Sequence, residues 1–464
     1  MSKQVFVVTF ILSVTLSANI TWAQVQSDTS STLDTQTAAV VHDSWPRFLG
    51  KQFDGAAQSV VHIDWTAEPE LVWALRVGKG YGLGAIDQGN YYHFDAAIDG
   101  STERLRCVDF ATGKSKWRKS SPLQYRDLYG YEDGPRSGAT IFDGLIYTMG
   151  VGGRLTCRNQ ATGDEVWKVD TNETFGVVKN FFGAGGAPLI AGDNVIVMVG
   201  GSPPNDQKVS PGALDRVSPN GSALVAFNRK SGKQTWVGGH DLASYSSPRT
   251  MMLDGETIVL LFARDHLLAI DPANGRQLWN FHHRAEIVES VNAMVPIVSG
   301  QHVFISECYA VGSVLLKVSR NEAKVVWQDP PRDRRRQAMR VHWSNPALID
   351  GHLFGCSGRN APDSDFRCIE LKTGAVKWVD PRRSRTAVTA VGDHLLVLQE
   401  KGPLQVMKAN TEKMEVVAQW DLTKPSGARP AIAYPCWAAP VVVGDKLLLR
   451  GDQQVLCLQL KARE

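Results

Sequence analysis

A tryptophan recurs at nearly constant intervals along this chain, and this repeat restricts the possible folds more than any other feature. Six of the seven intervals span 42 to 51 residues and the other spans 69, for the series Trp73, Trp117, Trp167, Trp236, Trp279, Trp327, Trp378 and Trp420. Five members end a Thr-Gly-x-x-x-Trp phrase or its Ser-Gly or Asn-Gly variant. A repeat of about 40 to 50 residues is typical of one blade of a β-propeller.

The residues upstream of each tryptophan support four strands per repeat. Two short apolar runs flank a Gly or Gly-Asp turn, as at residues 188–197 and 440–449. Glycine permits the positive φ of a tight hairpin turn, and β-branched residues favour buried strands. A third apolar run leads to the Thr-Gly turn, and the tryptophan lies in the fourth. Eight such hairpins predict eight blades.

The two ends of the repeat region complement each other. Residues 439–460 hold three predicted strands without a tryptophan strand, whereas residues 71–75 form a tryptophan strand without its hairpin. Pairing them removes two exposed sheet edges. We therefore predict an all-β domain at residues 45–460: an eight-bladed β-propeller of four-stranded blades, closed by the N-terminal strand completing the last blade.

The N-terminus indicates export. Lys3 precedes an apolar stretch at residues 5–16, and Thr21-Trp22-Ala23 offers a small-residue cleavage site before Gln24. This stretch is too short to cross a bilayer. We predict a signal peptide at residues 1–23, a flexible leader at 24–44 and no transmembrane segment. The mature protein is expected to be periplasmic or secreted, and soluble after signal-peptide removal.

Charge and cysteine content exclude several classes of function. The net charge of +3 on 464 residues gives no field suited to nucleic acid. Seven cysteines occur, none in a Cys-x-x-Cys pair, so no metal site is predicted. Four of them share one third-strand position and are interpreted as small buried residues: Cys107, Cys157, Cys368 and Cys457. Pairing of Cys356 with Cys368 remains open.

Candidate functional residues come from positions that the repeat does not conserve in type. Residues just before the innermost strand of each blade face the central funnel of a propeller. Three residues upstream of that strand's first residue, six blades carry Arg136, Gly185, Tyr245, Ala293, Trp343 and Trp437. With neighbours added, the funnel candidates are Arg136, Tyr245, Ser246, Asn292, His342, Trp343 and Trp437. An arginine among aromatic rings is typical of a binding site for an anion. The alternative is that these rings fill the channel as packing.

The repeat phrase, with Leu-x-Ala/Cys-x-Asp/Asn before Thr-Gly-x-x-x-Trp, resembles that of pyrroloquinoline-quinone (PQQ) dehydrogenases and of the BamB-type outer-membrane assembly propeller. Phrases at residues 45–50, 133–136, 243–248, 309–317 and 436–440 resemble exported PQQ-binding-like repeat proteins. The resemblance covers about residues 45–460 and implies the propeller fold and a place in the cell envelope.

The resemblance leaves three functions open. The dehydrogenases carry an adjacent Cys-Cys pair, which this chain lacks, and a catalytic aspartate beside a calcium held by carboxylate and amide oxygens. PQQ with calcium is therefore the alternative, and no cofactor and no catalytic residue are expected. A non-catalytic, BamB-like role is favoured, with an envelope protein or peptide bound on the loop face. The third option is a small anionic or carbohydrate ligand in the funnel.

Overall fold

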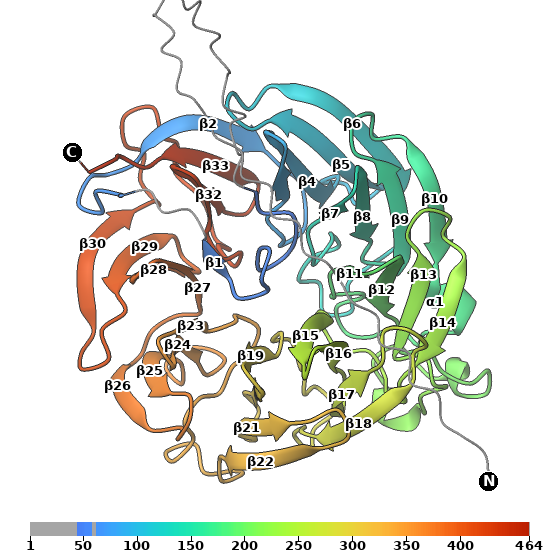
Figure 1. Ribbon diagram of the computed structural model, residues 1–464. Coiled ribbons are helices and arrows are strands. Elements are labelled where there is room, and N and C mark those ends of the chain that lie inside the picture. The colour runs from blue at the N-terminus through green and yellow to red at the C-terminus, as the bar shows by residue number, and fades with distance from the viewer. Residues whose placement is uncertain (1–43, 58–61, 464) are drawn as a thin grey trace, which may run out of the picture. The chain divides into compact units, whose positions relative to one another are not determined.

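The computed structural model describes residues 44–57 and 62–463 (Figure 1). The predicted signal peptide, and all of the predicted leader except Ser44, lie outside the described residues. Eight antiparallel sheets follow one another around a ring, with the first strand of each innermost and the tryptophan strand outermost. The prediction of an all-β, eight-bladed propeller is confirmed.

The first four blades use consecutive strands. Their bounds are β3 (Ala85–Asp87), β4 (Asn90–Ala96), β5 (Thr102–Asp109) and β6 (Ser115–Pro122); β7 (Thr140–Phe142), β8 (Leu145–Met149), β9 (Arg154–Asn159) and β10 (Glu165–Asp170); β11 (Leu189–Ala191), β12 (Asn194–Met198), β13 (Leu224–Asn228) and β14 (Gln234–Gly238); β15 (Arg249–Leu253), β16 (Glu256–Phe262), β17 (His266–Ile270) and β18 (Gln277–His282).

The next three blades follow the same order, and the eighth borrows a strand. Their bounds are β19 (Ile297–Ser299), β20 (His302–Glu307), β21 (Gly312–Val318) and β22 (Ala323–Gln328); β23 (Ala347–Ile349), β24 (His352–Ser357), β25 (Asp365–Glu370) and β26 (Val376–Asp380); β27 (Thr386–Val391), β28 (His394–Gln399), β29 (Pro403–Lys408) and β30 (Glu415–Asp421); β31 (Val441–Val443), β32 (Lys446–Arg450) and β33 (Gln454–Gln459).

The ring closes as the sequence predicts. Strand β2 (Glu70–Arg76) pairs antiparallel with β33 and supplies the outermost strand of the eighth blade. Trp73 lies opposite Cys457 in this pair, in the register that six of the other tryptophan strands use. The first and last parts of the propeller are therefore held in one sheet (Figure 1).

The repeated tryptophans join neighbouring blades. In six blades the indole N–H donates to a backbone carbonyl in the Thr-Gly turn region of the next blade, at N···O distances of 2.7 to 3.1 Å: Trp73, Trp167, Trp236, Trp279, Trp327 and Trp378. Apolar side chains fill the space between sheets, so that Leu189 and Ile196 of the third blade share a buried cluster with Val259 and Leu268 of the fourth. The indoles act as the predicted packing groups.

Small residues make room for six of the eight indoles, and Leu lies opposite Trp327 and Trp420. Cys or Ala lies opposite the tryptophan in six sheets, as Cys157 lies opposite Trp167 and Ala226 opposite Trp236. This explains the shared position of four cysteines. All seven cysteines are buried and free, so Cys356 and Cys368 do not pair.

A segment before the first blade crosses the inside of the ring, which the sequence did not indicate. Trp45 pairs with Ile86 of β3, and the guanidinium of Arg249 in β15 donates to the Phe53 carbonyl at 3.1 Å. The segment then forms β1 (Ala56–Ala57), which pairs in parallel with β27. One short strand of the chain thus extends the seventh blade toward the ring axis.

In the part of the chain that the structure describes, helical structure is limited to short inserts in the loops of the second and third blades. They are α1 (Thr171–Phe175) and the 3-10 helices η1 (Asp206–Lys208) and η2 (Leu214–Arg216). Within the described residues, no helix has the length and apolar character needed to span a membrane.

The contact between turn glycine and indole can be tested with two glycines of similar backbone conformation. Gly232 has φ +70° and a Cβ there would lie 2.6 Å from the Trp167 ring, whereas Gly144 has φ +71° with nothing within 4 Å of a Cβ. Gly144→Ala should cost about 1 kcal/mol, from the backbone alone. Gly232→Ala should cost about 1–3 kcal/mol more, because the methyl group overpacks the indole. The midpoint of thermal unfolding measures both, and equal midpoints for the two variants would contradict the proposed contact.

Candidate functional site

A cavity of about 280 Å³ lies within the ring, on the side of the loops that connect one blade to the next. Each of these inter-blade loops contributes at least one lining residue, so the cavity surrounds the ring axis. The crossing segment contributes Trp45, Arg47, Phe48, Leu49 and Gly55. The inter-blade loops therefore form the walls of this cavity, and the crossing segment forms part of its lining.

All six residues of the register upstream of the innermost strands line this cavity: Arg136, Gly185, Tyr245, Ala293, Trp343 and Trp437. His342, next to Trp343, lines it as well. This position, which carries Arg, Gly, Tyr, Ala and Trp in different blades, therefore faces the cavity. Its role in binding stays a prediction.

Ser246 and Asn292 do not line the cavity, and their side chains hold loops in place. Ser246 is fully buried and its hydroxyl donates to the Met294 carbonyl at 2.7 Å. The Asn292 amide donates to the carbonyls of Ala263 and Arg264, both at 3.0 Å. Both residues therefore fix the loops on which their neighbours reach the cavity.

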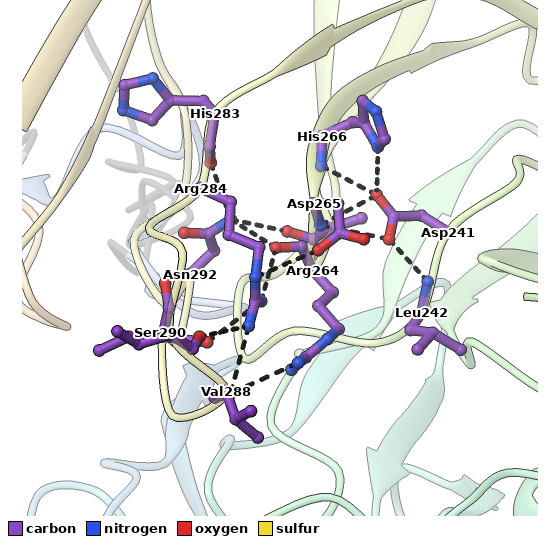
Figure 2. Close-up of polar contacts among 12 residues, drawn as sticks. Asp241, Leu242, Arg264, Asp265, His266, His283, Arg284, Val288, Ser290 and Asn292 are labelled. Carbon is purple, nitrogen blue, oxygen red and sulfur yellow. Dashed lines mark hydrogen bonds and ion pairs between the residues drawn. The ribbon is translucent and has the colours of Figure 1, made fainter. Parts of the chain in front are cut away.

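Asn292 belongs to a larger polar network that orders the loop before β19 (Figure 2). Arg284 lies 3.3 Å from Asp265 and donates to loop carbonyls, including that of Ser290 at 3.3 Å. Asp241 accepts bonds from backbone N–H groups and lies 3.0 Å from His266 Nδ1. These groups are engaged with one another or with the backbone, which is the arrangement of a structural network.

The charges in the cavity lining have one sign. The lining includes four arginines, Arg47, Arg136, Arg359 and Arg385, and no Asp, Glu or Lys occurs among its described residues. Within the described residues, only Arg136 of these four is paired with a carboxylate, that of Asp127 at 2.8 Å. The lining itself therefore has an excess of positive charge. Behind it lies, besides Asp127, the carboxylate of Glu400, which accepts from Trp437 Nε1 at 3.0 Å.

The arginines lie against aromatic faces. The guanidinium of Arg359 lies 5.3 Å from the ring centre of Tyr309, and that of Arg385 lies 5.3 Å from the Trp437 ring. Arg136 lies 5.1 Å from the Tyr81 ring. Such stacking holds a guanidinium in place. Arg385 is held further by its Nε, which donates to the Arg359 carbonyl at 2.9 Å and to Asn360 Oδ1 at 3.0 Å.

Four lining residues carry a buried polar atom without a partner within the described part of the chain. The atoms are Arg47 Nε, Arg136 Nη1, Ser137 Oγ and His342 Nδ1. Buried polar groups in folded proteins are nearly always hydrogen-bonded, so such a cluster is typical of a site that receives a ligand or ordered water. All four of these atoms are donors or can be donors.

The titratable rings of the lining are neutral. Desolvation, aided by Arg385 and Arg359, lowers the pKa of His342 to about 3. Its Nε2 lies 3.2 Å from the Tyr309 hydroxyl. Burial raises the pKa of Tyr309 and of Tyr81 above the ordinary value for tyrosine. At neutral pH the arginines are therefore the charged groups of the described lining.

Counting three residues upstream of each inner strand did not identify some of the lining residues, for reasons that the structure shows. Arg385 directly precedes β27, which lacks the proline that opens other inner strands. Tyr309 and Arg359 lie on turns between the second and third strands of their blades, which reach the cavity from a different position in the repeat. Arg47 lies in the crossing segment, and its only signal was the phrase at residues 45–50 that resembles a family motif.

Comparison with known proteins assigns the family. A family model described as outer membrane protein assembly factor BamB matches residues 101–380. The chain belongs to this family. No curated protein sequence matches it.

Solved structures show how widely the fold of this BamB family is shared. BamB from Moraxella catarrhalis is 14% identical, with 86% of this chain and 99% of that chain covered and a TM-score of 0.54. A europium-containing methanol dehydrogenase is 12% identical, with coverage of 88% and 89% and a TM-score of 0.62. A quinohemoprotein alcohol dehydrogenase from Comamonas testosteroni is 13% identical, with coverage of 91% and 81% and a TM-score of 0.50. At these identities the likeness establishes the fold alone.

The cavity can be compared with what PQQ and calcium require. A planar, carboxylate-bearing quinone is compatible with stacked rings and arginines. Calcium needs several oxygen ligands, usually including carboxylates. The described lining has no carboxylate, and no group of three or more His, Cys, Asp or Glu side chains suited to a metal occurs within the described residues. The donor set therefore does not fit the calcium-bound cofactor.

A buried carboxyl near the cavity leads to a prediction about pH. Glu307 accepts bonds from Ser290 Oγ and the Tyr309 N–H, both at 2.9 Å, and burial raises its pKa from 4.5 to about 7. Between these values the folded chain binds more protons than the unfolded chain, so the contribution of Glu307 to stability falls as pH rises. Glu307→Gln should remove this fall. Between pH 5 and pH 8 the free energy of unfolding of the variant should therefore rise relative to that of the wild type by up to about 3 kcal/mol.

Thermal unfolding at several pH values measures this difference. Glu103, whose pKa burial also raises to about 7, is present in both proteins, so the difference isolates Glu307. Substitution of an exposed glutamate, Glu412→Gln, provides the matched control. Parallel pH curves for Glu307→Gln and the wild type would show that Glu307 titrates normally.

Proposed function

We propose that this chain is an exported, non-catalytic binding protein of the cell envelope that takes an anionic group into its ring cavity. The observation that carries the proposal is the one-sided charge of the lining, with four arginines and no carboxylate among the described residues. The family supports the envelope setting, since its description is that of an outer-membrane assembly factor. The anionic group belongs either to a small ligand or to an envelope partner.

The geometry supports binding better than oxidation. Dehydrogenation of an alcohol needs a base to accept the hydroxyl proton. The described lining has no carboxylate for this, and His342 makes a weak base because its pKa is lowered to about 3. The arginines remain protonated and so serve as donors to an anion. Each group in the lining is thus suited to holding a ligand.

An aromatic anion should therefore bind in the cavity. We expect 8-anilinonaphthalene-1-sulfonate to bind saturably with an increase in its fluorescence. Its rings can pack on the aromatic side chains of the lining, and its sulfonate can accept from the arginines. Trp343→Ala and Arg385→Ala should each weaken binding at least about tenfold, equivalent to 1.4 kcal/mol. Fluorescence titration of the purified mature protein measures this.

Arg216→Ala is the matched control, since Arg216 is exposed and absent from the cavity lining. Equal binding by all three variants would place the probe elsewhere and contradict the proposal. The same protein should not reduce a dye when given PQQ, Ca²⁺ and a primary alcohol. Dye reduction that Arg385→Ala abolishes would instead establish the dehydrogenase alternative.

Export gives a separate prediction. Expressed in a Gram-negative host, the full chain should be found in the periplasm or medium, with Gln24 as its first residue, because residues 1–23 are a signal peptide. Mass spectrometry of the purified protein determines the N-terminus. Replacing Val7 and Phe10 by Asp should retain the chain in the cytoplasm, and processing of that variant at Gln24 would contradict the assignment.

A further inference from the structure

The cavity is part of a longer aromatic surface, here called the aromatic strip: Tyr434, Trp437, Tyr81, Phe182, Tyr131 and Tyr129. On one side, the ring centres of Tyr434 and Trp437 are 5.9 Å apart and those of Trp437 and Tyr81 are 4.8 Å apart. On the other, Phe182 contacts Tyr131 at 5.7 Å and Tyr129 at 6.0 Å. Two runs of rings therefore approach the cavity from different loops.

Arg136 joins the two runs. Its guanidinium lies over the Tyr81 ring, and its Nε donates to the Phe182 carbonyl at 2.9 Å. The strip thus continues from the loop before β31, across the loops before β3 and β7, to the loop before β11. Its inner rings line the cavity, as Trp437, Tyr81 and Phe182 do.

The ends of the strip are open to solvent. Tyr434 is 55% exposed at one end, and Tyr129 and Tyr131 are 52% and 51% exposed at the other. A small ligand confined to the cavity would not use these end rings. A row of rings that enters the cavity from solvent and leaves it again suits an elongated ligand.

The chemistry of the strip selects among elongated ligands. A pyranose ring packs its apolar C–H face on an aromatic ring while its hydroxyl groups remain free to hydrogen-bond. The unpartnered Ser137 hydroxyl and neutral His342 imidazole can serve such hydroxyl groups. The arginines favour negative charge in the ligand, because Arg359 is exposed, stacks on Tyr309 and makes no ion pair within the described residues.

We propose that the aromatic strip and the cavity together bind an acidic oligosaccharide, with sugar rings on the aromatic faces and carboxylate or sulfate groups on Arg359 and Arg385. This inference rests on the proposed function and names the ligand class for the same cavity. The charge complementarity favours this ligand over neutral saccharides, which lack a group for the arginines. Rings presented as a row favour it over peptides, whose side chains need separate pockets.

Calorimetric titration with tetragalacturonate and with its fully methyl-esterified form tests the proposal. The two share one carbohydrate chain and differ in charge. We expect saturable binding of the acid and at least tenfold weaker binding of the ester. A double variant, Arg359→Ala with Arg385→Ala, should weaken binding of the acid at least tenfold, whereas the Arg216→Ala control should not. Tyr129→Ala, at the end of the strip, should weaken the binding of tetragalacturonate but leave the binding of the galacturonate monomer unchanged.

Each outcome supports or overturns the inference. A sulfated tetrasaccharide from chondroitin sulfate extends the test to sulfate groups, and binding of either acid that depends on the two arginines supports it. Equal binding of the acid and the ester, or no binding of either acid, overturns it. Tighter binding of a Glu-Tyr peptide with the same dependence on the arginines also overturns it, in favour of a peptide. Because the sulfonate probe reports on the cavity independently, its retained binding would show that only the ligand class is wrong.

Discussion

The contact between each outer-strand indole and the next blade is the interaction on which this structure depends. A four-stranded sheet cannot bury its two faces by itself, so each blade is stable only against its neighbours. In six blades the indole N–H donates to a backbone carbonyl there, and in six sheets a small residue such as Cys157 or Ala226 leaves room for the ring. Because the same contact is repeated around the ring, all blades have the same orientation relative to their neighbours. Consequently all inter-blade loops meet on the same side, where the cavity lies.

This repetition explains how much of the site could be predicted from the sequence. When every blade has the same geometry, a position in the repeat is equivalent to a place in space, so a register counted from the inner strand located Arg136, Tyr245, Trp343 and Trp437 at the cavity. The same counting did not place the residue next to the register correctly. Ser246 is adjacent to the register but its side chain turns into the protein and bonds a backbone carbonyl.

The residues that the sequence could not place are those outside the repeat. The crossing segment contacts the first, fourth and seventh blades through Trp45, Phe53 and Ala57, and these contacts follow no sequence period. Its presence nevertheless determines what the cavity can accept, since it adds Arg47 and Phe48 to the lining. Periodicity therefore predicts the walls of a propeller cavity, while an aperiodic segment decides how the channel is closed.

The arrangement of charge links binding to stability. Arg359 and Arg385 make no ion pair within the described residues and repel each other, and the aromatic faces beneath them offset only part of that cost. Unpartnered atoms such as His342 Nδ1 add a further cost. A bound anion would remove both penalties in the folded state alone, so ligand and fold would stabilise each other by mass action. The anion binding proposed for the cavity would therefore satisfy groups that packing alone leaves unsatisfied.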